Sequence, residues 1–243
     1  MPKPDSEAAL EKATVDLFSQ LGWQVLDCFE ERLLGQVPGT SEVPGTLRET
    51  SMSRKLPTFT PGHYYHLYNR GRSRLSIFHE AENYLFVLGK LKKYLAELQI
   101  AIIAYVLMPN HYHFLVRQDG DKAAGLLAQR IFNSYSKAYN KRFVHSGTLF
   151  EGPYDARHVH TDAYLRHLCR YIHANPVKDG LVQHIEEWPY SNYHEWMGLR
   201  AGTLIDREFV KDYFPDRDGY KEFVVDYLLD RRLADDLGYL REW

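Results

Sequence analysis

The sequence predicts an α+β fold in which an antiparallel sheet carries helices on one face. An aromatic-rich strand is expected at residues 63–69, and residues 100–108 form an apolar run with several β-branched side chains. A Pro-Asn turn then leads into a third strand, residues 111–116, which completes a hairpin. Helical segments follow the first and third strands, and this order is typical of ferredoxin-like or RNA-recognition-type domains.

Three helices are expected in this region. The first, Ala81–Leu98, places five leucines at helical spacing on one face. The second, Asp121–Phe143, has a basic end. The third, Thr161–Asn175, begins at a Thr or Asp cap and is expected to stop at Pro176, because proline disrupts the helical hydrogen bonds.

Composition divides the chain into four segments. Residues 1–32 are expected to form a short helix and strand, and residues 33–62 have the Pro, Gly, Ser and Thr content of a linker. Residues 63–200 hold the α+β domain. Residues 201–243 are acidic and predict a helical C-terminal tail.

The overall composition excludes several classes of protein. The chain has 243 residues, 44% hydrophobic and 26% charged, which is ordinary for a globular protein and excludes a disordered or collagen-like one. No apolar run approaches the roughly 20 residues of a membrane-spanning helix, and the polar, acidic N-terminal residues lack the apolar stretch that is expected of a signal peptide. The two cysteines stand far apart, which argues against a disulfide scaffold and favours a cytoplasmic location.

Charge and histidine are unevenly distributed along the chain. Residues 51–200 hold 19 basic and 12 acidic side chains, whereas residues 1–50 hold 4 and 9, and residues 201–243 hold 7 and 11. A basic middle segment suggests a polyanionic partner, although solvated surface charge would give the same pattern. Ten of the 12 histidines lie between His63 and His173, so the chemistry is expected in this segment.

Two His-x-His pairs are candidate metal ligands. His111 and His113 lie on a predicted strand, so both side chains project from the same face, about 7 Å apart. Two imidazoles suit a transition-like ion, and added oxygen ligands make Mg²⁺ or Mn²⁺ acceptable. The alternative is one structural and one surface histidine. His158 and His160 share the spacing but lack a flanking apolar strand, so they are the weaker pair.

The third predicted helix supplies a candidate nucleophile. Tyr171 and Asn175 are four residues apart and share one helical face. A tyrosine hydroxyl can attack a phosphodiester, and an amide oxygen can complete a metal site. Tyrosines more often serve in packing, and Tyr135 and Tyr139 on the second helix are rival nucleophiles.

Residues from about 63 to 193 resemble the REP-associated tyrosine transposases, a branch of the single-tyrosine HUH transposases. The matching motifs are YHLYNRGRSRLSIF, MPNHYHFLV, GTLFEGPYDAR, and RYIHANPVKDGLV followed by WPYSNY. An HxH motif alone is weak, but its combination with the RYIxxNPVxxG block some 60 residues later is specific.

This resemblance implies a role for each matching position. His111 and His113 correspond to the two histidines of the HUH motif, whose middle residue is normally bulky and apolar but is Tyr112 here. Tyr171 corresponds to the nucleophile. Asn175 stands where the family places a polar third metal ligand.

The reaction implied by the resemblance is metal-assisted cleavage of single-stranded DNA through a 5′-phosphotyrosine intermediate, followed by strand joining. Its substrates would be palindromic repeat hairpins, its cofactor Mg²⁺ or Mn²⁺, and the protein a monomer or homodimer. Tyr64, Tyr65 and Phe150 are candidates for stacking on bases. The candidate phosphate contacts are Arg70, Arg72, Arg74, Arg157, Arg166, Arg170 and Lys178.

Two other functions are compatible with the sequence. One is a non-catalytic, domesticated nucleic-acid-binding protein on the same fold, and the other is a metal-dependent phosphodiesterase that uses water. Separately, residues 6–31 resemble the opening of the nuclease domain of type I restriction enzyme R subunits, without the acidic and lysine residues that this nuclease needs. A truncated, non-catalytic fusion is therefore expected there, or a true start at Met52.

Overall fold

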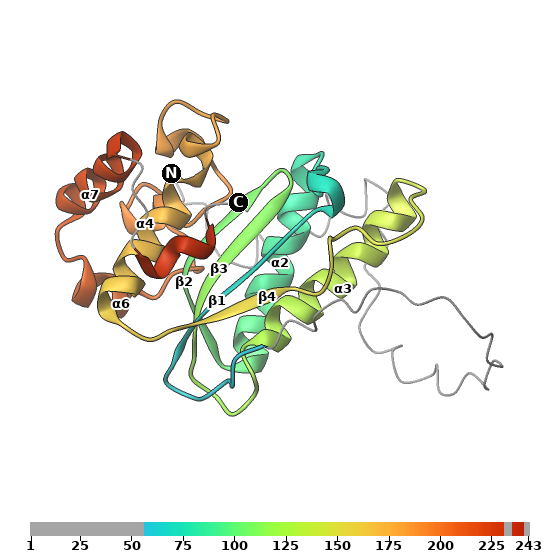
Figure 1. Ribbon diagram of the computed structural model, residues 1–243, viewed down its shortest axis with the longest axis horizontal. Helices are drawn as coiled ribbons and strands as arrows, with labels where there is room; N and C mark the ends of the chain where they lie inside the picture. The colour runs from blue at the N-terminus through green and yellow to red at the C-terminus, as the bar shows by residue number, and fades with distance from the viewer. Residues whose placement is uncertain (1–55, 231–234, 241–243) are drawn as a thin grey trace, which may run out of the picture. The chain divides into compact units, whose positions relative to one another are not determined.

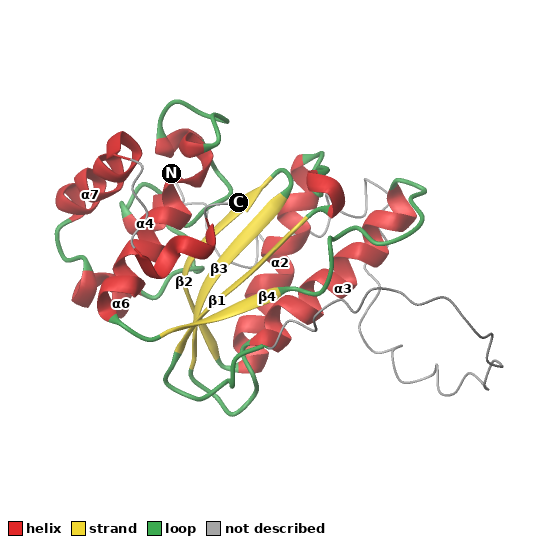
Figure 2. Ribbon diagram, viewed as in Figure 1, coloured by secondary structure: helices red, strands yellow, loops and turns green. Residues whose placement is uncertain are grey.

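The computed structural model describes residues 56–230 and 235–240. The expectations for the helix and strand of residues 1–32, and for most of the linker, lie outside the described residues. Within them, the fold class is confirmed: a four-stranded antiparallel sheet is covered by helices (Figures 1 and 2). No helix among the described residues is long and apolar enough to cross a membrane.

The sheet has the strand order β2-β3-β1-β4. The strands are β1 (Tyr64–Arg70), β2 (Ile100–Met108), β3 (His111–Gln118) and β4 (Asp155–Val159). All pairings are antiparallel, and β2 and β3 form the expected hairpin around Pro109 and Asn110. The strand β4 contains His158, so this part of the weaker His-x-His pair lies on a sheet edge.

Two long helices cover one face of the sheet. They are α2 (Ala81–Leu98) and α3 (Gly125–Arg142). They bury alternate residues of the strands, among them Tyr65, Leu67, Tyr112 and Phe114. The bounds of α2 are the predicted ones, whereas α3 begins four residues after the predicted start at Asp121.

A second helical layer covers the opposite face, beyond the single layer that the sequence predicts (Figure 1). Its main helix is α4 (Asp162–Lys178), which packs on β2 and β3. Thr161 caps its N-terminus by accepting a hydrogen bond from the Tyr164 amide at 3.1 Å. Pro176 lies inside the last turn and does not stop the helix, which continues to Lys178.

The C-terminal segment belongs to this second layer. It contains α6 (Arg207–Tyr213), α7 (Arg217–Asp230) and the 3₁₀ turn η4 (Asp235–Leu240), while α5 (Tyr193–Trp196) precedes it. Val224 and Tyr227 of α7 are buried in the same apolar cluster as Leu168 and Ile172 of α4. The described residues of this segment are therefore a packed part of the domain, although the composition of the segment is acidic.

Short 3₁₀ turns and two isolated bridges complete the structure. η2 (Arg72–Arg74) follows β1, and η3 (Ile185–Glu187) follows α4. Gly71 sits where an added Cβ would lie 2.0 Å from the Leu75 carbonyl oxygen, so only glycine permits this close turn. The turn holds the arginine-rich loop beside the β2–β3 hairpin, through a hydrogen bond from the Gly71 amide to the Asn110 carbonyl.

Candidate active site

The strand β3 presents His111 and His113 to the face covered by α4. Both imidazoles are buried, and their ring centroids lie 5.1 Å apart. The intervening Tyr112 points to the other face and stacks on Phe132 of α3 at 3.9 Å. The two histidines therefore project from the same face of the sheet, as the alternation of side chains along a strand predicts.

Each of these histidines has a defined partner at Nδ1. The amide nitrogen of Asn110 donates to the Arg74 carbonyl, so its Oδ1 faces Nδ1 of His111 at 2.7 Å. That Nδ1 must therefore carry the proton, which places the lone pair of His111 on Nε2. Nδ1 of His113 lies 2.9 Å from Nε2 of His66, a fully buried residue of β1.

Burial keeps these histidines neutral. It lowers the pKa of His111 to about 4, and the nearby Asp179 carboxylate opposes that shift. Burial also lowers the pKa of His113 well below its usual value, with His66 and His111 adding to the effect. Neutral imidazoles are the form that binds a metal ion.

The helix α4 brings Tyr171 against this pair. The Tyr171 ring meets the His113 ring edge-on, with centroids 5.6 Å apart. One turn later, Asn175 donates from Nδ2 to the Tyr171 carbonyl at 2.8 Å, which directs its buried Oδ1 away from the helix backbone. The Asn175 side chain lies next to the His111 imidazole and raises its pKa.

Lys178 approaches the Tyr171 hydroxyl. Its Nζ lies 3.4 Å from Oη and 5.0 Å from the ring centroid. Burial raises the pKa of Tyr171, and the neighbouring Tyr227 and Asp179 raise it further, while Asn175 lowers it. The ammonium group of Lys178 is therefore a cation placed where a tyrosinate charge would develop.

The opposite side of α4 is anchored by a buried polar network. His173 lies two residues after Tyr171, roughly 200° around the helix. Its Nδ1 lies 2.6 Å from the Tyr220 hydroxyl of α7, and its Nε2 lies 2.9 Å from Oδ1 of Asn192. Asn192 also joins this network to β2. Its Oδ1 accepts a hydrogen bond from the Tyr105 amide, and its Nδ2 donates a hydrogen bond to the Ile103 carbonyl. The network fixes the rotation of α4 and thereby the direction of Tyr171.

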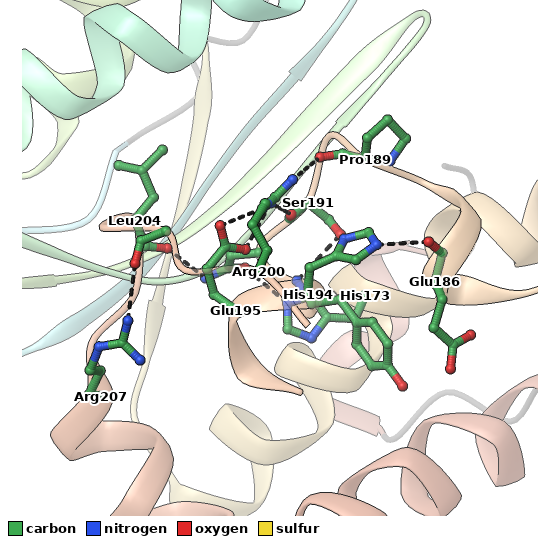
Figure 3. Close-up of polar contacts among 12 residues, drawn as sticks. His173, Glu186, Pro189, Ser191, His194, Glu195, Arg200, Leu204 and Arg207 are labelled. Atoms are coloured by element: carbon green, nitrogen blue, oxygen red, sulfur yellow. Dashed lines mark hydrogen bonds and ion pairs between the residues drawn. The ribbon is translucent and has the colours of Figure 1, made fainter. Parts of the chain in front are cut away.

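An ion pair holds the WPYSNY segment next to this network. Figure 3 shows Arg200 between the Glu195 carboxylate and the backbone carbonyls of Pro189 and Ser191. The distances from Arg200 are 2.6 and 2.8 Å to Glu195, 2.8 Å to Pro189 and 2.6 Å to Ser191. Ser191 in turn bridges to Val106 of β2, so the segment protects this sheet edge.

The rival nucleophiles and the rival histidine pair lie elsewhere. The Tyr135 hydroxyl donates to the Ile77 carbonyl, and the Tyr139 hydroxyl pairs with His79 at 2.7 Å, both in the α2 and α3 layer. His158 is opposite Tyr65 in the sheet and lies 2.8 Å from His63. None of these residues is brought together with His111 and His113.

The residues of the site fit a divalent cation. Among residues 56–230 and 235–240, no group of three or more His, Cys, Asp or Glu side chains could hold a metal ion. A site there must therefore use another type of ligand. The lone pair on His111 Nε2 and the buried amide oxygen of Asn175, with His113 beside them, form such a mixed nitrogen and oxygen donor set.

The seven candidate phosphate contacts fall into three groups. Arg70, Arg72 and Arg74 surround the turn beside the hairpin, where Arg70 pairs with Glu151 and the other two are exposed. Arg157 stacks over Tyr239 at 5.2 Å on the α4 face, and Lys178 contacts Tyr171. The last two arginines, Arg166 and Arg170, face the C-terminal helices. Arg166 stacks on Tyr213 and Phe214. Arg170 stacks on Phe223 and Tyr227.

Two of the aromatic residues that the sequence suggested for base stacking are core residues. Tyr65 is 0% exposed and Phe150 is 9% exposed, and both pack in the α2 and α3 layer. They are unavailable to DNA, because the sheet face on which they lie is covered. Tyr64 is half-buried and packs on Phe209 of α6.

Comparisons with known proteins agree with the motifs. Residues 60–175 match the family model described as "Transposase IS200 like". The chain is 28% identical over 97 residues to the REP-associated tyrosine transposase of Escherichia coli (strain K12), a match that covers 38% of this chain and 54% of that protein. The match thus spans about half the length of this curated relative.

A solved structure supports the same fold. It is described as a REP-associated tyrosine transposase bound to a REP hairpin, and it superposes with a TM-score of 0.50 at 20% identity. The superposition covers 64% of this chain and 94% of that chain. The resemblance to the REP-associated tyrosine transposases is therefore confirmed.

Proposed function

We propose that this chain, which resembles the REP-associated tyrosine transposases in its central segment, is a transposase that cleaves and rejoins single-stranded DNA. Its substrates would be palindromic repeat hairpins, and its covalent intermediate a 5′-phosphotyrosine on Tyr171. The observation that carries this proposal is the placement of Tyr171 against His113, with Lys178 at its hydroxyl.

In the proposed reaction, the Tyr171 oxygen attacks the scissile phosphorus and its proton is released. The bond to the 3′ oxygen breaks, and that oxygen takes up a proton to leave as a 3′-hydroxyl. The 5′ phosphate stays on the tyrosine, so the energy of the bond is retained and a second 3′-hydroxyl can reverse the step. Strand joining therefore needs no ATP.

The residues around the tyrosine have separate roles. His111, His113 and Asn175 would hold a Mg²⁺ or Mn²⁺ ion, which when bound polarises and orients the phosphate. Lys178 would stabilise the phenolate that forms as the proton leaves. The exposed arginines of η2, Arg72 and Arg74, would bind flanking phosphates.

One observation favours a second candidate, namely DNA binding without cleavage. Tyr171 is 1% exposed, and Tyr227 of α7 packs edge-on against its ring at 6.2 Å. A phosphate can reach the hydroxyl only if the contacts around it open. A domesticated protein that has kept the fold would show the same burial and would bind DNA without reacting.

Covalent adduct formation distinguishes the two candidates. The full chain is incubated with single-stranded hairpin DNA and Mn²⁺ or Mg²⁺, and denaturing gels report a protein–DNA adduct. The transposase predicts an adduct that is lost in Tyr171→Phe and kept in the matched variant Tyr139→Phe. Binding with no adduct would support the second candidate, and metal-dependent cutting with no adduct would indicate hydrolysis by water.

A further inference from the structure

His66 forms the first link of a buried hydrogen-bonded chain that starts at His113. The His66 side chain is 0% exposed and projects from β1 to the α4 face of the sheet. Its Nε2 lies 2.9 Å from Nδ1 of His113, and its Nδ1 lies 2.6 Å from the Tyr239 hydroxyl of η4. The Tyr239 hydroxyl in turn lies 2.8 Å from the Tyr164 hydroxyl of α4.

The hydrogen bonds that link His113, His66 and Tyr239 can run in only two directions. The buried His66 imidazole lies between two hydrogen-bonding neighbours, and in its neutral form it has one N–H to share between them. In one direction, His113 Nδ1 donates to His66 Nε2, and His66 Nδ1 donates to the Tyr239 oxygen. In the other direction, Tyr239 donates to His66, and His66 Nε2 donates to Nδ1 of His113.

Only the first direction makes His113 a ligand on the side of His111. When Nδ1 carries the proton, the lone pair of His113 is on Nε2. In the second direction Nε2 carries the proton and cannot bind a cation. The direction of the chain is thus coupled to whether His113 can bind a metal ion.

We propose that His66 is a positioning residue that keeps the proton of His113 on Nδ1 and so presents Nε2 to the divalent cation. Asn110 has the same role for His111, through a side chain whose orientation is fixed by the Arg74 carbonyl. The proposal rests on the proposed function only in taking His113 as a metal ligand. Outer partners of metal-binding histidines commonly act in this way.

Tyr239 supports the required direction from a distance. As an acceptor it satisfies the N–H of His66, while its own proton can go to Tyr164. Without the hydroxyl, His66 Nδ1–H would be buried with no acceptor at that position, which is unfavourable. His66 would then move its proton to Nε2 and force His113 into the tautomer that cannot bind the ion.

The test measures Mn²⁺ affinity of the full chain by isothermal titration calorimetry. His66→Leu keeps much of the volume and removes the acceptor, and we expect Mn²⁺ to bind about 10- to 100-fold more weakly. His66→Gln can still accept through its amide oxygen and should restore most of the affinity. Tyr239→Phe should weaken binding about tenfold, although this residue does not contact the ion. The matched control is His63→Gln, because His63 precedes the same strand and pairs with His158.

A second readout follows the tautomers directly. Two-bond ¹⁵N–¹H correlation spectra of the ¹⁵N-histidine-labelled, metal-free chain should show His66 and His113 protonated at Nδ1. In Tyr239→Phe both protons should move to Nε2. Unchanged Mn²⁺ affinity and unchanged tautomers in this variant would overturn the proposal even if His66→Leu fails to fold.

The same measurements separate the two proposals. Failure of the parent chain to bind Mn²⁺ would overturn the role of His66, because His113 would then not be a ligand. Mn²⁺ binding that depends on His66, in a protein that forms no DNA adduct, would support the role of His66 and refute the transposase reaction alone.

Discussion

Both faces of the sheet bury aromatic side chains, but the polar groups buried with them differ between the two faces. On the face of α2 and α3, several buried tyrosine hydroxyls pair with backbone carbonyls or with a neighbouring side chain, as when Tyr135 donates to the Ile77 carbonyl. On the face of α4 lie all four buried histidines of the described residues, which are His66, His111, His113 and His173. The first face supplies packing, and the second holds groups that can exchange protons or bind a cation.

The difference shows that burial alone does not indicate a catalytic tyrosine. Tyr135 and Tyr171 are both buried, both lie on long helices, and burial raises the pKa of each. They differ in their partners: Tyr135 has a carbonyl acceptor, whereas Tyr171 has an ammonium group and an imidazole beside it. A nucleophile needs neighbours that stabilise its charged form.

The largest expected effect is a difference between two alanine variants, one of His113 on the face of α4 and one of His158 on the face of α2 and α3. His113→Ala should abolish Mn²⁺-dependent adduct formation, because a polarising metal ion is worth several kcal/mol, or at least about a hundredfold in rate. His158→Ala, on the other face, should keep both metal dependence and rate. Adduct gels over a range of Mn²⁺ concentrations measure this, and equal losses in the two variants would contradict the assignment.

The next effect concerns how stability depends on pH. Burial lowers the pKa of His173 to about 4, against 6.5 for an ordinary histidine. Below pH 6.5 the unfolded chain therefore binds a proton that the folded chain does not, so stability falls as the pH decreases toward 4. Each such histidine contributes about 1.4 kcal/mol per pH unit.

Urea denaturation at several pH values with EDTA present tests this effect. His173→Gln should make the dependence on pH less steep, because it removes one of these groups. Tyr135→Phe should lower stability by a similar amount at every pH. A parent protein whose stability does not change between pH 6.5 and 4.5 would show that the buried histidines are not neutral.

A smaller effect is expected on the free energy of unfolding when Tyr135 or Tyr171 is replaced by phenylalanine. Tyr135→Phe leaves the Ile77 carbonyl without this donor, and the expected loss of unfolding free energy is about 1–2 kcal/mol. Tyr171→Phe removes a long 3.4 Å contact to Lys178 and should change stability by less than about 0.5 kcal/mol. Denaturation at pH 7 measures both variants. A larger loss for Tyr171→Phe would indicate that this tyrosine is structural.

The strands and helices next to the site could be predicted because local patterns determine them. The bounds of α2 and β2 follow from leucine spacing and a β-branched run. The second helical layer was also implied in principle, because a strand that is apolar throughout is buried on both faces. The continuation of α4 past Pro176 could not be predicted, since it depends on packing that holds the last turn.

For the candidate site, spacing predicts which residues share a face but not their partners. His111 and His113 follow from the period of a strand, and Tyr171 and Asn175 follow from the period of a helix. The sequence does not single out His66, because the role proposed for it comes from pairing between β1 and β3 and from a turn more than 170 residues away. Strand alternation places His66 and Tyr68 on the same face and does not distinguish between them.

The smallest expected effect comes from removing the N-terminal residues, which takes away nothing described on either face. The contacts described for both layers and for the candidate site join residues from 56 onward. A protein that begins at Met52 keeps all of these residues, and we expect it to fold, bind Mn²⁺ and form the adduct as the full chain does. Residues 1–50 have a net charge of −5, so their removal should, if anything, tighten binding to DNA at low salt, by less than about threefold. Filter binding at two salt concentrations measures this. Loss of solubility or of adduct formation in the shortened protein would show that the site depends on more than the two faces of the sheet.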